Sequence, residues 1–181
     1  MSLLLATLLP GLFLALLGGL LLWNDPRIKS TAKALPRSQR AAWLFFGAGA
    51  AWFVWRLSSV GESDLIFFQQ PTPLMIGFGV LAVLAFIYTP DFLAVRGLCV
   101  LMILAGEPLL RAAYMEWSHP QRLLMVTAVY LGLVIALYLA AAPYRLRDFF
   151  EWLFGAPSRP RLLGTILLVY GLATSAAAFT Y

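Results

Sequence analysis

Residues 3–23 read LLLATLLPGLFLALLGGLLLW, an apolar run that contains no charged residue. A helix of about 20 apolar residues crosses the hydrocarbon core of a bilayer, so this run predicts a transmembrane helix. The whole chain of 181 residues is 62% hydrophobic, whereas soluble domains are about 45–50% apolar. Because a soluble fold of this length could not bury so much apolar surface, we expect an integral membrane protein.

Five more apolar stretches follow the first. The six predicted spans are Leu3–Trp23, Ala41–Leu57, Pro73–Tyr88, Phe92–Tyr114, Leu123–Ala142 and Leu162–Thr180. The third would rise about 24 Å as a helix, slightly less than a bilayer core, so whether 73–88 crosses fully is open. Pro90 cannot continue a helix and Asp91 is a good N-cap, which predicts a tight hairpin between the third and fourth spans. The expected fold is all-α: a polytopic membrane helix bundle that forms one integral membrane domain over residues 1–181.

The basic residues predict how this bundle is oriented in the cell (inner) membrane, because positively charged short loops stay cytoplasmic. Ten of the 13 Lys and Arg fall on one side of a chain with six spans: Arg27, Lys29, Lys33, Arg37, Arg40, Arg96, Arg145, Arg147, Arg159 and Arg161. Loops 24–40 and 143–161 should therefore be cytoplasmic and both termini outside. Positive charges at the ends of apolar segments match anionic lipid headgroups, and this placement argues against nucleic acid as a partner.

The fifth loop predicts a short amphipathic helix. Its apolar residues recur with helical spacing and its charges share the opposite side; the apolar set is Leu146, Phe149, Phe150, Leu153 and Phe154, and the charged set is Arg147, Asp148 and Glu151. Such a helix should lie flat on the cytoplasmic face of the membrane, either as a connector or as a lipid-sensing or partner-docking element. In the second loop, the apolar patch Leu65–Phe68 should dip into the interface.

Small residues predict where the helices pack, because close approach in lipid requires short side chains. The last span has a narrow stripe of them, and the first and second spans offer further sets: Gly164, Gly171, Ser175 and Ala178; Gly11, Ala15 and Gly18; Gly47 and Ala51. We expect these to form contacts within one chain rather than dimer seams.

The fourth span holds the candidate substrate-binding or ion-binding residues, Arg96, Glu107 and Arg111. A charge buried in hydrocarbon costs at least about 2.5 kcal/mol, so ionisable residues inside spans are functional candidates. Glu107 also lies between Gly106 and Pro108, a pair that could kink or interrupt the helix and free backbone carbonyls, as at transporter binding sites. In the alternative interpretation, Arg96 anchors at the inner interface and Glu107 and Arg111 form an i,i+4 pair at the outer end.

No cofactor, metal or catalytic residue is predicted. The only histidine, His119, rules out bis-histidine haem ligation within one chain, and the only cysteine, Cys99, rules out an intrachain disulfide. Zinc-protease, nucleophile-elbow and P-loop motifs are missing from the sequence. Glu116 and His119 are too few to close a metal site.

Three classes of function follow from these observations. The first is a non-catalytic subunit or scaffold that packs with itself, as a homo-oligomer, or with other proteins in a larger membrane complex. The second is a small transporter, channel or substrate-capture component with a polar site on the fourth span. The third is a membrane-embedded lipid-modifying enzyme, which ranks last because the sequence offers no nucleophile, base or metal set.

Overall fold

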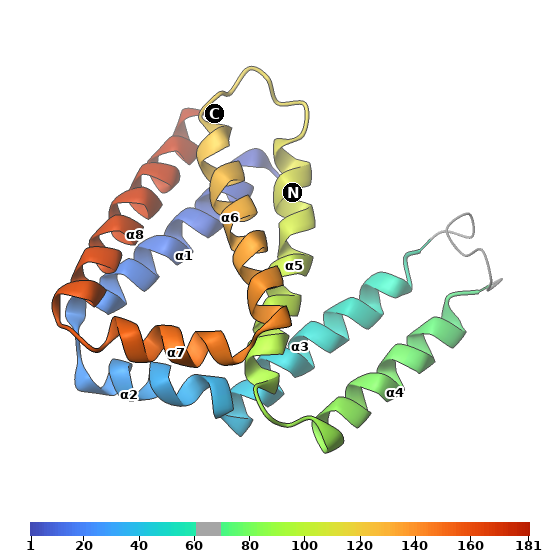
Figure 1. Cartoon of the computed structure of the whole chain (residues 1–181). Helices are drawn as coiled ribbons and strands as arrows, with labels where there is room; N and C mark the ends of the chain where they lie inside the picture. Colours follow the sequence, from blue (N-terminus) through green and yellow to red (C-terminus); the bar gives the residue numbers. More distant parts are fainter. Residues whose placement is uncertain (61–69) are drawn as a thin grey trace.

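The computed structural model describes residues 1–60 and 70–181, and the regular structure in these ranges is helical (Figure 1). The α-helices are α1 (Leu3–Trp23), α2 (Pro26–Ala34), α3 (Gln39–Leu57), α4 (Thr72–Tyr88), α5 (Leu93–Ala113), α6 (Arg122–Ala141), α7 (Tyr144–Leu153) and α8 (Ser158–Ala177). The same ranges contain two short 3₁₀ helices, η1 (Leu35–Arg37) and η3 (Ala178–Thr180). The predicted interfacial patch Leu65–Phe68 lies outside the described residues.

Within residues 1–60 and 70–181, four helices are long and apolar enough to cross a membrane, which agrees with a membrane protein. They cover Leu3–Trp23, Leu93–Ala113, Arg122–Ala141 and Ser158–Thr180. The second and third predicted spans coincide with α3 and α4, which are weaker candidates. α4 is only 17 residues long, and α3 is less apolar because Gln39, Arg40 and Arg56 lie near its ends.

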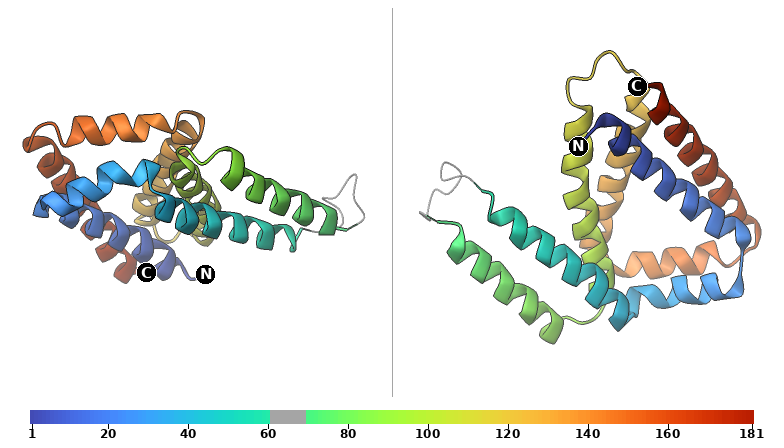
Figure 2. Two further views of the ribbon diagram at one scale, coloured as in Figure 1. Left: turned by 90° about the horizontal axis from the view of Figure 1, so that it is seen from below. Right: turned by 180° about the vertical axis from the view of Figure 1, so that it is seen from behind.

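The helices form two tight pairs and a side arm. α1 and α8 run antiparallel, and α5 and α6 form a hairpin (Figure 1). The two pairs meet near the chain termini and diverge toward the other end, where α2 and α7 lie side by side (Figure 2). The α3–α4 hairpin, which we call the arm, extends away from the rest and is attached through contacts between α3 and α5.

Glycines bring α1 and α8 into backbone contact. A Cβ added to Gly18 would overlap the backbone of Leu168, and one added to Gly171 would overlap the backbone of Ala15. A Cβ on Gly11 would lie 2.5 Å from Ser175 Oγ. The expectation that the small-residue sets of the first and last spans meet within one chain is confirmed.

The small-residue face predicted for the second span is wrong. Gly47 has open space around it, with no atom within 4 Å of an added Cβ, and Ala51 is exposed. Instead, Ala42 and Gly49 are the buried residues of α3. They are seven residues apart and therefore share one helix face. That face packs on α5, where Gly97 leaves room for the backbone of Phe46.

The predicted N-cap of the fourth span is also wrong. Phe92, rather than Asp91, occupies the cap position of α5, and its φ of 58° places it in the left-handed region. The ring of Phe92 packs against the buried cluster that contains Val95 and lies under the guanidinium of Arg37, 5.4 Å from its Cζ. Tertiary contacts of an aromatic ring thus determine this turn, in place of a local side-chain cap.

α5 is the central helix of the fold because it contributes to all three hydrophobic clusters. It packs with α1 and α6 around Met125, with α6 around Cys99, and with α3 around Leu93. Residues on α5 are therefore held by contacts with several other helices. This central position matters for the candidate site, because Arg96, Glu107 and Arg111 all belong to α5.

The fifth loop forms a helix, α7, whose apolar residues are divided between two directions. Leu153 is buried and Leu146 packs on the cluster around Cys99, whereas Phe149 and Trp152 are exposed. On the charged side, Arg147 donates to Asp148 at 2.7 Å. This hydrogen bond raises the pKa of Arg147 above its usual value. α7 is therefore attached to the bundle by one edge and presents aromatic rings along another.

Candidate functional site

Glu107 makes two ion pairs, one that connects α5 to the C-terminal half of α3 and one within α5. Its Oε2 accepts a hydrogen bond from Arg56 Nη2 at 3.1 Å, and its Oε1 lies 3.5 Å from Arg111 Nη1. The side chains of Arg56 and Glu107 are 45% and 47% exposed, and that of Arg111 is 80% exposed. The cluster of one carboxylate and two guanidiniums carries a net charge of about +1 and is accessible from outside the protein.

The candidate residues of the fourth span do not all meet. Glu107 and Arg111 form the i,i+4 pair that was expected as the alternative to a buried site. Arg96 is exposed near the other end of α5, about 16 Å away along the helix axis at 1.5 Å per residue. The structure therefore brings two of the three residues together and leaves Arg96 apart.

Arg56 is the residue that sequence reasoning missed. It lies in the last turn of α3, and α3 and α5 are neighbours in the fold. The sequence did contain one signal for this contact. With six predicted spans, Arg56 and Arg111 lie on the same side of the membrane. Helix adjacency, which the sequence did not reveal, was the missing information.

The Gly106–Pro108 pair does not interrupt α5. The helix continues from Leu93 to Ala113 with Pro108 inside it. Gly106 is buried, and a Cβ there would lie 2.9 Å from Leu133 Cδ2 of α6. The glycine is thus explained by the close packing of α5 on α6, and the expectation of a broken helix with free backbone carbonyls is wrong.

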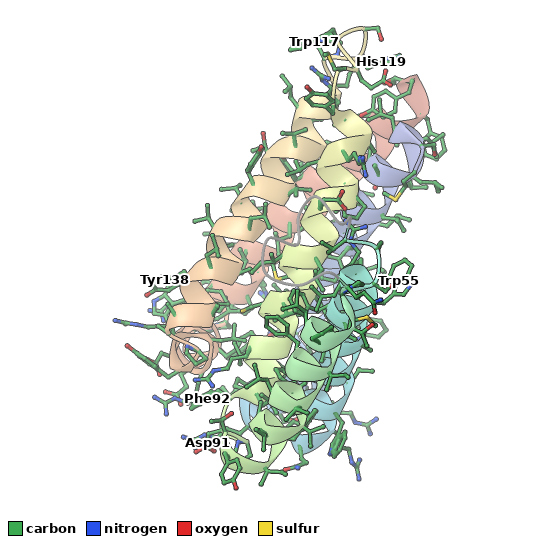
Figure 3. All side chains as sticks on the ribbon, turned by 90° about the vertical axis from the view of Figure 1, so that its right-hand side faces the viewer. Trp55, Asp91, Phe92, Trp117, His119 and Tyr138 are labelled. Carbon is green, nitrogen blue, oxygen red and sulfur yellow. The ribbon has the colours of Figure 1, made fainter. Side chains whose placement is uncertain are left out.

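A cavity of about 710 Å³ opens beside Glu107 and Arg111, at the end of the molecule that carries Trp117 and His119 (Figure 3). Its rim includes Arg122, the first residue of α6. Arg122 Nη1 donates to the carbonyl of Ala113 at 2.6 Å, and its Cζ lies 4.8 Å from the ring centre of Trp117. Leu123, Val126 and Tyr130 continue the wall along α6. We call this the rim cavity.

A second cavity, of about 490 Å³, lies among α1, α3, α5 and α6 and is apolar. Its described lining side chains are all uncharged, and they include Phe13, Trp52, Met102 and Leu133. Glu107 is not among them, although its neighbours Gly106 and Pro108 are. The ionisable residues of α5 therefore do not converge on the space between the helices.

The C-terminal residue closes the same end of the bundle. The rings of His119 and Tyr181 meet edge to face with centres 5.2 Å apart, and Thr7 Oγ1 donates to the hydroxyl of Tyr181 at 3.1 Å. Within residues 1–60 and 70–181, no three His, Cys, Asp or Glu side chains come close enough together to hold a metal ion. Tyr181 thus contacts the α5–α6 loop through His119 and α1 through Thr7.

The opposite end of the molecule gathers most of the basic residues. α2 and α7 are in contact, and η1 touches both of them and the start of α5. The loops 24–40 and 143–161 are therefore neighbours in space, and we call this surface the basic end.

In comparisons with known proteins, the chain matches no protein-family model, no curated protein and no solved structure.

Proposed function

We propose that this protein is a non-catalytic subunit or scaffold of the cell membrane, with six spans, which assembles through its arm with a second copy or with another membrane protein. In this proposal, α3 and α4 cross the membrane as the second and third spans, the basic end is cytoplasmic, and α7 lies at the cytoplasmic interface. The observation that carries the proposal is the isolation of α4.

α4 packs on one neighbour for most of its length. Its main contacts are with α3, and only Ala85 and Phe86 near its end join the cluster at the start of α5. None of its residues, all of which the structure describes, is buried. Every other long apolar helix of the described chain has buried residues on at least one face. Among the described residues, no other helix covers the side of α4 that faces away from α3.

The free side of α4 is suited to another helix. Gly77, Val80, Leu84 and Ile87 follow i, i+3, i+7 and i+10 spacing, which places them on one face. Val80 and Ile87 are more than half exposed, and a Cβ added to Gly77 would meet no atom within 4 Å. Helices in lipid associate by close van der Waals packing at small residues, and Gly77 offers such a point on this face.

A transport pathway receives less support from the same geometry. Transport of a polar substrate requires polar groups at mid-depth, but the space among α1, α3, α5 and α6 is lined by uncharged, mainly apolar side chains. Glu107 instead joins two arginines at the ends of α3 and α5. These observations favour the subunit or scaffold over the transporter.

Cysteine cross-linking in native membranes tests the proposal. Cys99 is buried and is the only cysteine, so a Cys99→Ala background provides a single-site system. In that background we expect Val80→Cys to form a cross-linked product of higher mass. Leu16→Cys on α1, where the native side chain is more exposed than that of Val80, should form none. A product of two chains would identify a homo-oligomer, and a product of another mass would identify a subunit of a mixed complex.

A pair of glycine variants serves as the matched control. Gly77→Leu in the Val80→Cys background should suppress the product because the new side chain blocks close approach. Gly19→Leu should leave it unchanged, since Gly19 also has open space around it but belongs to α1. Equal cross-linking of Val80→Cys and Leu16→Cys, together with a mass of one 20.0 kDa chain in mild detergent, would refute the proposal.

A further inference from the structure

Polar and apolar side chains both line the rim cavity. Arg111, Trp117 and Arg122 lie in or beside the loop that joins α5 to α6, and we call their end of the cavity its mouth. Leu110 of α5 and Leu123 and Val126 of α6 form the apolar walls. From Arg122 to Tyr130 the groove follows α6 for about 12 Å, at 1.5 Å per residue. A ligand that fits this shape has a polar head and an apolar tail.

The charge at the mouth is positive. Glu107 is shared by Arg56 and Arg111, so its single negative charge is already compensated. Arg122 adds a further positive charge, and its described contacts are a backbone carbonyl and the ring of Trp117 rather than a carboxylate. Glu116 belongs to the same loop but does not line the cavity. The charged residues that line the cavity, Glu107, Arg111 and Arg122, carry a net charge of about +1. Arg56 adds a positive charge next to Glu107, so the site attracts an anion.

The chemistry of these side chains points to a phosphate. Guanidinium groups bind phosphate oxygens through paired N–H donors, more strongly than they bind neutral acceptors. Arg111 has most of its side chain exposed, which leaves its donors available. Tryptophan and tyrosine rings prefer the headgroup level of a bilayer, and Tyr114, Trp117 and Tyr130 all line this cavity.

We propose that the rim cavity binds an anionic phospholipid, with the lipid phosphate between Arg111 and Arg122 and one acyl chain along Leu110, Leu123 and Val126. In the six-span arrangement the lipid belongs to the outer leaflet, opposite the basic end. This proposal is independent of the assembly role of the arm, because no residue of α4 contributes to the cavity.

Native mass spectrometry of the purified protein, with lipids added in mixed micelles, tests the proposal. The four probes are phosphatidylglycerol, phosphatidylcholine, diacylglycerol and glycerol phosphate. We expect a retained one-to-one adduct with phosphatidylglycerol, a weaker one with phosphatidylcholine, and none with diacylglycerol, which lacks the phosphate. Glycerol phosphate lacks the acyl chains and should bind at least about tenfold more weakly, a difference of about 1.4 kcal/mol.

Charge-removing variants locate the adduct. Arg111→Gln combined with Arg122→Gln should weaken phosphatidylglycerol binding at least tenfold. Arg27→Gln combined with Lys29→Gln removes the same charge from the basic end and should leave the adduct unchanged. Because Arg122 also holds the loop through Ala113, Arg111→Gln alone provides a second test, and it should weaken binding without lowering the unfolding temperature of the lipid-free protein.

Three results would overturn the proposal. The first is an adduct that survives in Arg111→Gln and in the double variant. The second is equal weakening by the basic-end variant, which would indicate attraction by overall charge. The third is binding of glycerol phosphate as tight as that of phosphatidylglycerol, which would indicate a site for soluble anions.

Discussion

The α1–α8 pair and the arm show two ways of joining apolar helices. In the α1–α8 pair, glycines on both helices allow backbone to touch backbone, and an added Cβ on Gly164 would lie 2.9 Å from the carbonyl oxygen of Gly18. In the arm, aromatic rings separate the helices. Trp43 stacks on Phe86 with ring centres 4.4 Å apart, and Phe53 meets Phe78 edge to face at 5.0 Å. A cavity of about 250 Å³ remains between them.

The difference shows that apolar composition alone does not determine how firmly two helices hold each other in lipid. Since lipid tails are as apolar as leucine, the gain comes from packing, and packing is best where side chains are absent. The α1–α8 contact should therefore be rigid and intolerant of substitution. The arm should accept changes, because rings can reorient and lipid can fill the gaps.

The largest expected effect is that of Gly171→Ala in α8. The new methyl group would overlap the backbone of Ala15, which cannot move without separating the two helices. Overpacking of this kind costs about 2–3 kcal/mol, measurable as a loss of free energy of unfolding in detergent titrations. Gly19→Ala is the matched control, and it should be neutral or stabilise by up to about 1 kcal/mol, because its site is open. Equal effects of the two variants would show that α1 and α8 are not in backbone contact.

Gly97→Ala in α5 should have the next largest effect. The new methyl group would overlap the backbone of Phe46. The arm is attached mainly through the contacts of α3 with α5, so it can relieve this overlap by shifting away from α5 as a unit. We expect a loss of about 1–2 kcal/mol in the free energy of unfolding. The same titration applies, with Gly47→Ala in open space as its control. If Gly97→Ala proved as harmless as Gly47→Ala, the attachment of the arm would be weaker than described.

Phe86→Ala tests the aromatic contacts within the arm. It removes the stack with Trp43 and the edge contact with Phe46, whose centres are 4.4 Å and 5.2 Å from that of Phe86. Each such pair contributes about 0.5–1.5 kcal/mol, and we expect a total near 1 kcal/mol because lipid replaces part of the lost contact. Ile76→Ala removes an exposed side chain of the same helix and should change stability less. If Phe86→Ala lowered the free energy of unfolding more than Gly171→Ala does, the arm would be held more firmly than the α1–α8 pair.

The smallest effect should be that of Glu107→Gln. Half-exposed ion pairs contribute at most about 1 kcal/mol, so folding and abundance should remain nearly intact. Measurement of the unfolding transition and of the amount of protein in the membrane checks this expectation. A large loss of assembly or of transport would instead place Glu107 in a site that binds a substrate or partner.

Sequence patterns predicted the features that depend on one helix at a time. The ends of α1, α5, α6 and α8 fall within a few residues of the predicted spans, because length and hydropathy determine where a helix can cross a bilayer. The glycine faces of α1 and α8 and the Glu107–Arg111 pair follow from helical spacing. The orientation in the membrane and the crossing of α3 and α4 are still predictions.

Features that depend on which helices become neighbours were not predictable from these patterns. Gly47 and Ala51 formed an equally good small-residue pair, but Gly49 is the one that faces α5. Asp91 is the better N-cap residue by its side chain, but Phe92 occupies the cap position, where its ring contacts other parts of the bundle. Arg56 and Arg122 complete the surroundings of Glu107 and Arg111 from other helices, and local spacing carries no information about them.

The contact between α1 and α8 joins helices from opposite ends of the described sequence. α1 is synthesised early, but α8, the helix that fits its glycine face, is synthesised after α7. Until α8 is made, that face of α1 has no partner helix within the chain. The backbone contact between α1 and α8 can therefore form only late in synthesis.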